Sequence, residues 1–214
     1  MAEVASGEWR EKDGSPVLQF FPPETTASSS FFTRHSQLIT RNSPLFRATR
    51  HYSEPLSPPM CVGIALAWSE LPTELIARNG LDRRAHERGG EREVRFFYRD
   101  RRPRLPIWRD GRLQIVRWGN GRGQSQFLPA TGWTWQTTIE EGYWRNLEAA
   151  FVDIPASLGF DHGVWFRIRQ GIRGILVPDE HGAAIVYMIC EPASHYYQIM
   201  TRSTRMPVLI EERI

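Results

Sequence analysis

The pattern of apolar and polar residues divides the chain at Met60. Residues 1–59 are rich in Ser, Thr and Pro and keep neither a helical nor a strand period, which is typical of a disordered segment. From Met60 onward, short apolar runs alternate with turns that contain Gly or Pro. Two interpretations of 1–59 stay open, a disordered extension or upstream DNA translated from a mis-assigned start. A folded domain is expected over 60–214.

Most of the elements predicted in this domain are strands. The clearest signal is "RLPIWRDGRLQIVRW" at 104–118, where two β-rich runs flank Asp110–Gly111, a pair that favours a two-residue type I′ hairpin turn. A charged stretch broken by glycine at 84–93 predicts a loop. Short apolar or alternating runs predict the other strands at 61–68, 94–100, 150–155, 163–169, 171–177, 183–190 and 204–210.

Two helices are predicted between these strands. The first runs from Ser69, its expected N-cap, to a stop at Asn79–Gly80. The second covers 138–150 and begins with a capping box formed by Thr138 and Glu141. Its buried face would consist of Ile139, Tyr143 and Leu147. The expected fold class is α+β, with mainly antiparallel, barrel-like β-sheets and a few flanking helices.

The basic residues gather in the middle of the chain. The formal net charge is only +3, but residues 78–122 hold fourteen arginines against six acids. A basic segment of this kind suits a polyanion such as nucleic acid. The alternative is a compositional bias from a GC-rich genome, because Lys12 is the only lysine.

Other bulk features narrow the class of protein. No apolar run approaches the roughly 18 residues of a membrane span, and the N-terminus lacks the apolar region of a secretory signal. Cys61 and Cys190 form neither a disulfide framework nor a zinc cluster. We therefore expect a cytoplasmic protein, monomeric, with no cofactor and no metal.

Three further residue types give weaker signals. Gly119, Gly121 and Gly123 lack the lysine and the following helix of a phosphate loop, so nucleotide binding is not favoured. The histidines show no metal-ligand spacing. The tryptophans beside arginine-bearing, glycine-rich segments fit either a hydrophobic core or a surface that stacks on single-stranded bases.

Cys61 carries the most specific chemistry. Inside a chain, a cysteine on an apolar strand is usually a small buried hydrophobe. If translation starts at Met60 and that methionine is removed, Cys61 becomes the N-terminal residue, with an α-amine of pKa about 8 beside its thiol. The amine can form a Schiff base with an aldehyde, and the thiol can then close a five-membered thiazolidine. The aldehyde that a cell offers in DNA is the ring-opened sugar of an abasic site.

Five short segments carry a family resemblance. They are Met60–Cys61, "IVRWGNG" at 115–121, "LPATGWT" at 128–134, "AAFVDIP" at 149–155 and "TRMPVLI" at 204–210. In order and spacing they resemble the SRAP family (SOS-response-associated peptidases, also known as abasic-site-processing proteins). The resemblance implies an SRAP-like domain over 60–214, in a bacterial or phage-related DNA-damage protein. Such a protein would bind single-stranded DNA and form a covalent cross-link to abasic sites through an N-terminal Cys61.

The chain departs from the family pattern where acid–base groups are expected. Val62–Gly63 stands in place of Gly-Arg, and Pro129–Ala130–Thr131 in place of Asn-Ala-Arg. Ser157 stands where the family has glutamate, and Ser203 where it has histidine. Because thiazolidine formation needs proton transfers, the retained cysteine requires substitutes for these groups.

The resemblance and the nearby sequence together give six candidate site residues. Cys61 is the expected nucleophile, and Asp153 and His195 are the candidate acid–base substitutes. The candidate nucleic-acid-binding residues are Trp118, Arg122 and Arg205. Two alternative functions stay open, an inactive SRAP-like module that binds nucleic acid without a covalent step, and a phage or bacterial domain with a protein partner.

Overall fold

The computed structural model describes residues 8–12, 15–19, 61–121 and 123–211 of a chain with two compact units, residues 1–51 and 52–214. In the first unit, β1 (Glu8–Lys12) and β2 (Ser15–Gln19) pair as an antiparallel hairpin that the sequence analysis did not predict. The two interpretations of 1–59 otherwise fall on residues outside this description.

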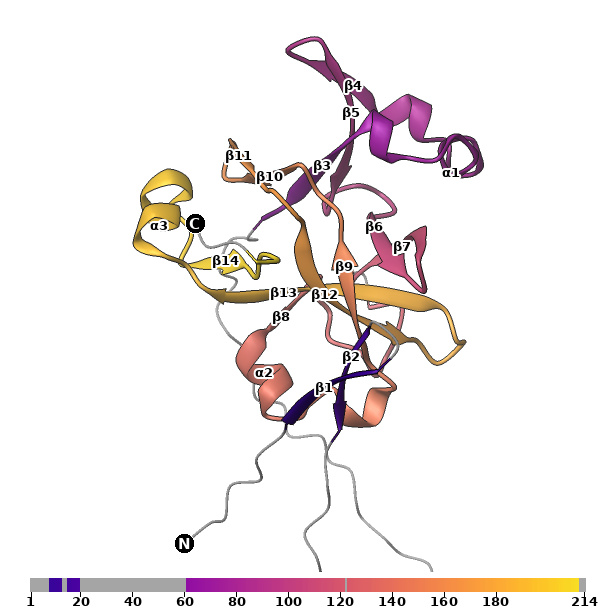
Figure 1. The fold of residues 1–214 in the computed structure, drawn as a ribbon, viewed down its shortest axis with the longest axis vertical. Helices are drawn as coiled ribbons and strands as arrows, with labels where there is room; N and C mark the ends of the chain where they lie inside the picture. The colour runs from indigo at the N-terminus through magenta and orange to yellow at the C-terminus, as the bar shows by residue number, and fades with distance from the viewer. Residues whose placement is uncertain (1–7, 13–14, 20–60, 122, 212–214) are drawn as a thin grey trace, which may run out of the picture. The chain divides into compact units, whose positions relative to one another are not determined.

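Five strands of the second unit close into a barrel (Figure 1). Their order is β12-β9-β6-β7-β13, and the ring closes because β12 also pairs with β13. Neighbours in the ring are antiparallel except β7 and β13, which run parallel. Strands β8 and β14 also pair with β13. The bounds are β6 (Arg104–Arg109), β7 (Arg112–Trp118), β8 (Trp133–Trp135), β9 (Ala150–Ile154), β12 (Ile172–Pro178), β13 (Ala184–Pro192) and β14 (Arg205–Pro207).

A second sheet of five antiparallel strands lies above the barrel in Figure 1, in the order β11-β10-β3-β5-β4. Its strands are β3 (Gly63–Ala67), β4 (Ala85–Arg88), β5 (Glu91–Phe97), β10 (Leu158–Asp161) and β11 (Val164–Arg167). The loop predicted at 84–93 is wrong, because β4 and β5 form a hairpin there. Gly89 and Gly90 make its turn with φ of 58° and 85°. The expected class, α+β with mainly antiparallel, barrel-like sheets, is confirmed.

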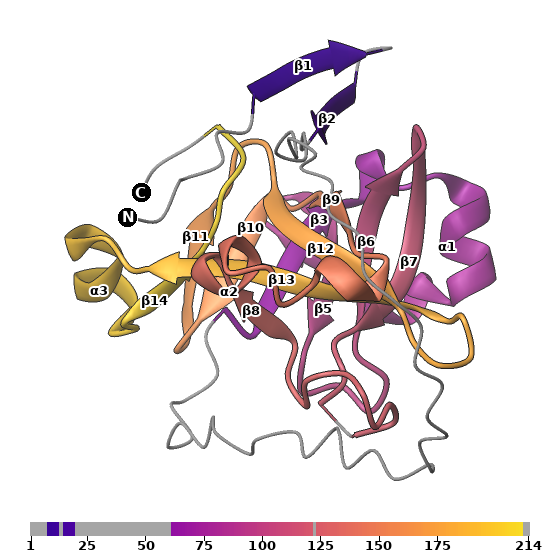
Figure 2. The same ribbon diagram turned by 90° about the horizontal axis from the view of Figure 1, so that it is seen from below.

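Three short α-helices flank the sheets in the described part of the chain. They are α1 (Thr73–Asn79), α2 (Gln136–Glu140) and α3 (His195–Thr201). In both views α1 lies beside β7, and α3 lies on the opposite side of the domain (Figure 1, Figure 2). Single 3₁₀ turns cover Trp68–Glu70, Leu81–Arg84 and Arg145–Leu147.

The helix boundaries correct two details of the sequence analysis. The predicted stop at Gly80 is confirmed, since its φ of 61° is the left-handed value of a helix C-cap, but the N-cap is Pro72 and not Ser69. The second helix begins two residues earlier than predicted and has no side-chain cap, so the capping box is wrong. It ends early because the following Gly142, with φ of 84°, breaks the helical path, and Tyr143 is left 51% exposed.

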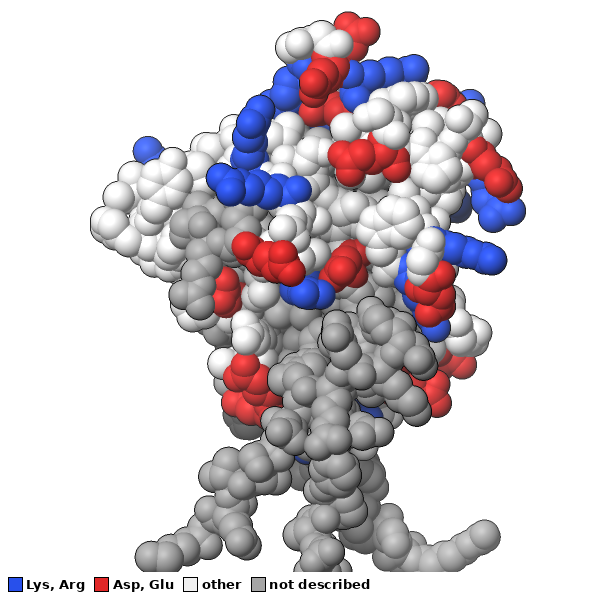
Figure 3. Space-filling view, viewed as in Figure 1, with Lys and Arg blue, Asp and Glu red and all other residues white. Residues whose placement is uncertain are grey.

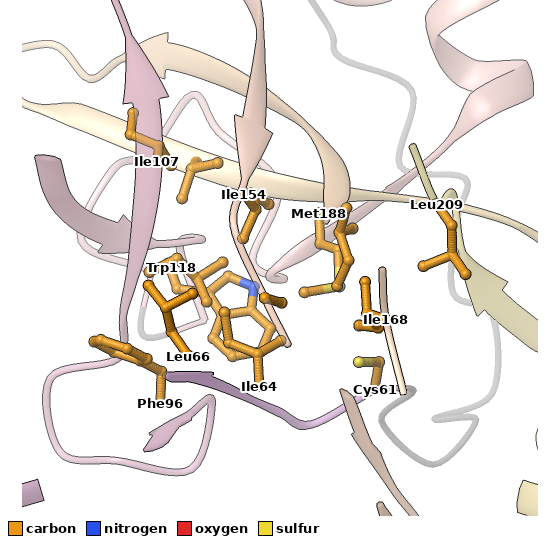
Figure 4. Close-up of a cluster of buried hydrophobic side chains, with 14 of the residues drawn as sticks. Cys61, Ile64, Leu66, Phe96, Ile107, Trp118, Ile154, Ile168, Met188 and Leu209 are labelled. Carbon is orange, nitrogen blue, oxygen red and sulfur yellow. The ribbon is translucent and has the colours of Figure 1, made fainter. Parts of the chain in front are cut away.

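The main hydrophobic core fills the space between the barrel and the second sheet (Figure 4). It combines Ile64, Leu66 and Phe96 of the second sheet with Ile107 and Ile154 of the barrel. Their apolar side chains alternate with the outward-facing positions of the same strands, as the two-residue period of a strand requires. The core therefore fixes β3, and the cysteine just before it, relative to the barrel.

Candidate functional site

Cys61 lies immediately before β3, and its side chain is completely buried. Its thiol donates to the carbonyl oxygen of Gly63, with an Sγ to O distance of 3.5 Å. The sulfur lies at the margin of the main core, near Ile168 (Figure 4). The backbone φ of Cys61 is 29°, a left-handed value that non-glycine residues rarely adopt.

Asp161 supplies the charge that acts on this thiol, and it too is completely buried. It is the last residue of β10, which pairs with β3. The next two residues, His162 and Gly163, form the turn to β11 with φ of 42° and 86°, positive at both positions as in a type I′ turn. The sequence "FDHGVW" carries this hairpin signal, a glycine-containing pair between two β-rich runs, and the sequence analysis missed it.

Two hydroxyl groups donate to one oxygen of the Asp161 carboxylate. Tyr197 Oη lies 3.0 Å and Ser203 Oγ 2.7 Å from Asp161 Oδ2. Tyr197 is held on α3, where the N-cap Ser194 accepts the backbone N–H of Tyr197. Helix α3 thus positions the Tyr197 hydroxyl next to the Asp161 carboxylate, which is distant in sequence.

His162 completes the group that we call the Cys61 cluster, namely Cys61, Asp161, His162, Tyr197 and Ser203. Its Nδ1 lies 2.8 Å from Asp161 Oδ1 and 3.1 Å from Ser203 Oγ. The contact with Oδ1 has the length but not the alignment of a hydrogen bond, so this buried oxygen has no hydrogen-bond partner among the described residues. The imidazole is about one-third exposed and connects the buried carboxylate to solvent.

Burial controls the protonation of Cys61 and Tyr197. Removal from water, with a smaller contribution from the charge of Asp161, raises the pKa of the Cys61 thiol to about 12. The same two causes and the nearby thiol raise the pKa of Tyr197 far above its usual value. At neutral pH both groups are therefore protonated, and the thiol must lose its proton to a neighbour before or while it reacts.

The structure separates the other predicted acid–base residues from this cluster. Asp153 lies on β9 of the barrel and pairs with Arg173 at 2.6 Å. His195 is exposed at the start of α3. Within the described residues, neither has a contact with Cys61. Strand pairing, which sequence proximity does not reveal, brings β10 beside β3 and so places Asp161, at the end of β10, near Cys61.

The predicted nucleic-acid-binding residues have three different placements. Trp118 is fully buried, donates Nε1–H to the carbonyl of Gly132 and packs on Tyr98, so its ring cannot stack on a base in this conformation. Arg205 is half-buried on β14, with its guanidinium 5.8 Å from the centre of the Trp135 ring. Arg122 lies outside the described residues.

An arginine-lined pocket of about 490 Å³ opens between segments 98–104 and 115–124. Its charged lining consists of Arg99, Arg101, Arg102, Arg104, Arg117 and Asp100. Asp100 is paired with Arg84 at 2.9 Å, and Arg117 with Asp179 at 2.7 Å. Arg101 and Arg102 are exposed, and the described part of the chain offers them no carboxylate partner. The pocket is therefore positive, and guanidinium groups suit a phosphate ligand.

Gly121 in the pocket lining and Gly132 in the nearby segment have a packing role. A Cβ on Gly121 would stand 2.1 Å from the Tyr98 hydroxyl, and one on Gly132 would stand 2.5 Å from the ring of the same residue. Asn120 holds the loop between them by donating to the carbonyls of Ser125 and Leu128. Packing therefore accounts for the glycines of "WGNG" and "TGW", and no bound nucleotide is needed to explain them. The same contacts hold the loop beside the pocket in place.

The charges on the face seen in Figure 3 are mixed, and neither sign gathers into a large patch there. Among the described residues, no group of His, Cys, Asp and Glu could hold a metal ion. None of the described helices has the length and apolarity to cross a membrane. Comparisons with known proteins find no family model, curated protein or solved structure that matches this chain.

Proposed function

We propose that this protein binds single-stranded DNA and captures abasic sites through Cys61 as its N-terminal residue. The observation that carries the proposal is the burial of the Cys61 thiol beside the Asp161 carboxylate, with two hydroxyls and an imidazole around that carboxylate. The short SRAP-like motifs of the sequence support the same function and an SRAP-like domain.

The cluster can supply the proton transfers that the reaction needs. The α-amine of Cys61 would attack the aldehyde carbon, and loss of one water gives an imine. Sγ then bonds to the imine carbon, while the thiol proton passes to the imine nitrogen and the thiazolidine closes. Since the thiol is protonated at neutral pH, Asp161 would accept that proton and His162 would exchange it with solvent.

The backbone at Cys61 also supports a free N-terminus. The φ torsion of a residue is defined by the carbonyl carbon of the residue before it, and a left-handed φ such as the 29° at Cys61 costs a non-glycine residue roughly 1–3 kcal/mol. A chain that begins at Cys61 has no such torsion and no such cost. Cleavage before Cys61 would therefore relieve strain and create the reactive amine in one step.

The arginine-lined pocket supports the DNA partner. Its arginines place several guanidinium groups around one cavity, and Arg101 and Arg102 have no carboxylate partner within the described ranges. A phosphodiester backbone would neutralise this charge, and its binding would weaken with salt. The same pocket favours a second function, single-stranded-DNA binding without covalent capture. The replacement of the family histidine by Ser203 fits this function, because binding alone needs no acid–base group.

The test compares a chain that begins at Met1 with one that begins at Met60. Intact mass establishes whether Cys61 is exposed as the first residue of each. Both are incubated with single-stranded DNA that carries one abasic site and are separated on a denaturing gel. We expect a heat-stable, shifted band only where Cys61 is N-terminal, and its loss in Cys61→Ser.

An Asp161→Asn variant tests the role of the cluster, with Asp153→Asn as the matched control. Asparagine still accepts the two hydroxyl donors but cannot take up the thiol proton, so we expect a much slower cross-link from Asp161→Asn and an unchanged rate from the control. A processed N-terminal cysteine that gives no cross-link would refute covalent capture and leave the binding function.

A further inference from the structure

The outer face of the five-stranded sheet carries a row of aromatic residues. Gly63 of β3 is paired with Phe160 of β10 on one side and with Phe97 of β5 on the other. Phe160 is in turn paired with Trp165 of β11. Because directly paired residues point to the same side of a sheet, one row crosses four strands in the order Trp165, Phe160, Gly63 and Phe97.

These rings lie outside the hydrophobic core. The core side of the same strands is formed by the alternate residues, such as Ile64 and Phe96. Trp165, Phe160 and Phe97 belong to neither core cluster of the described residues and are each partly exposed. Arginine side chains lie over the rings of Trp165 and Phe97, and the partial exposure of all three residues leaves part of the aromatic surface available to a ligand.

The three rings form one continuous cluster. The centroid distances are 4.8 Å between Phe160 and Trp165, and 5.7 Å between Phe97 and Phe160. Gly63 makes this approach possible, because a Cβ there would stand 2.5 Å from the ring of Phe97. The missing side chain lets Phe97 lean across β3, and the result is an aromatic platform (Phe97, Phe160 and Trp165).

Arginine side chains lie over two rings of the aromatic platform. The guanidinium groups of Arg88 and Arg95 lie 4.6 Å and 5.1 Å from the centre of the Trp165 ring, and that of Arg99 lies 4.9 Å from the centre of Phe97. Arg88 and Arg95 share a single carboxylate, that of Glu93, at 3.1 Å and 2.7 Å. The three arginines and one acid leave a net positive charge beside the rings.

We infer that the aromatic platform is a base-stacking site for single-stranded DNA. Aromatic rings on an open sheet face bind unpaired bases by stacking, and adjacent arginines contact the phosphates between them. Gly63 lies two residues after Cys61, so the aromatic platform is close in sequence to the proposed nucleophile, whose side chain faces the core on the other side of the sheet. Stacking was predicted for Trp118, but that residue is buried, and the aromatic platform can bind bases in its place. That the ligand is DNA rests on the proposed function.

The test measures binding of the full chain to two labelled oligomers by fluorescence anisotropy. One is an oligothymidylate, and the other has the same sugar-phosphate backbone with every base absent. The variants are Trp165→Leu and Phe160→Leu, which remove a ring but keep apolar volume. Phe151→Leu is the matched control, since Phe151 is 59% exposed on β9 of the barrel.

We expect each platform variant to bind the oligothymidylate about 5- to 150-fold more weakly, the effect of losing one stacked base. The control should bind as the wild type does, and the base-free oligomer should bind weakly and equally to all four chains. Equal affinity of wild type and Trp165→Leu for the oligothymidylate would overturn the inference, as would equal affinity of the wild type for both oligomers.

These outcomes are independent of covalent capture. Neither oligomer offers an aldehyde, so the anisotropy reports stacking alone, whether or not Cys61 is N-terminal. Loss of the cross-link with platform binding intact would refute the proposed capture and keep the stacking site. If the cross-link forms but both leucine variants bind the oligothymidylate as the wild type does, the proposed capture stands and the stacking site is refuted. The platform would then bind something else, such as a second copy of the chain.

Discussion

The hydroxyl of Tyr197 should stabilise the domain far more than an ordinary surface hydroxyl. It donates to Asp161 Oδ2 at 3.0 Å, and both side chains are completely buried. Tyr197→Phe removes this donor and keeps the ring, which packs edge-on against Phe166 with centroids 5.3 Å apart. The variant therefore isolates one hydrogen bond to a buried carboxylate, with no new cavity larger than an oxygen atom.

A hydrogen bond to a charged group contributes about 1.5–3 kcal/mol to the free energy of unfolding. For a domain of this size, each kcal/mol lowers Tm by about 2–4 °C, so Tyr197→Phe should lower Tm by roughly 3–12 °C. The neighbouring Tyr196 is 64% exposed. Its change to Phe is the matched control and should shift stability by less than about 0.5 kcal/mol.

Urea unfolding followed by far-UV circular dichroism measures both variants, and a double variant with Ser203→Ala tests the shared acceptor. Because Tyr197 and Ser203 donate to the same oxygen, the two losses should be non-additive. Equal stability of the Tyr197→Phe and Tyr196→Phe chains would refute the assignment of a buried, hydrogen-bonded carboxylate to this site.

Two further predictions concern titratable groups. With the pKa of the Cys61 thiol raised to about 12 by burial and Asp161, iodoacetamide near pH 8 should alkylate Cys61 of the chain that begins at Met1 only in urea, as read by peptide mass. Burial alone would raise the pKa of Glu93, but hydrogen bonds from Arg88 and Arg95 lower it below 4.5. The stabilisation from these hydrogen bonds is present above pH 4.5 and is lost as the pH falls through the pKa of Glu93 in the folded protein. Urea titrations across this range should therefore show a flatter pH dependence for Glu93→Gln.

Local signals allowed the sequence to predict much of the fold. The turn at Asp110–Gly111, with φ of 51° and 69°, is a two-residue hairpin because these residue types tolerate positive φ. The apolar runs that became β12 and β13 are buried on both faces and need no partner to be recognised. The three-residue strand β8 was missed, because its parallel pairing with β13 depends on tertiary contacts.

The candidate site was predictable only in part, for the same reason. Cys61 could be named from its own chemistry and from the methionine before it. Asp161 could not, because it reaches Cys61 through the pairing of Leu158 with Ala65, a contact that no local pattern encodes. Asp153 and His195 are predicted from their residue type and their place in the sequence, and the structure shows that these two criteria do not place a side chain beside Cys61.

The residues of the Cys61 cluster are far apart in the sequence, so the ribosome makes Cys61 well before the residues that surround it. Asp161 and Tyr197 lie 100 or more positions after Cys61, so a ribosome adding roughly 5–20 residues per second leaves the thiol without these neighbours for several seconds. During that interval the nascent segment is open to an aminopeptidase, and afterwards it is closed inside the fold. Under the proposed function, the residue before Cys61 must therefore be removed before the domain folds, and a chain that folds unprocessed lacks the amine that the capture reaction needs.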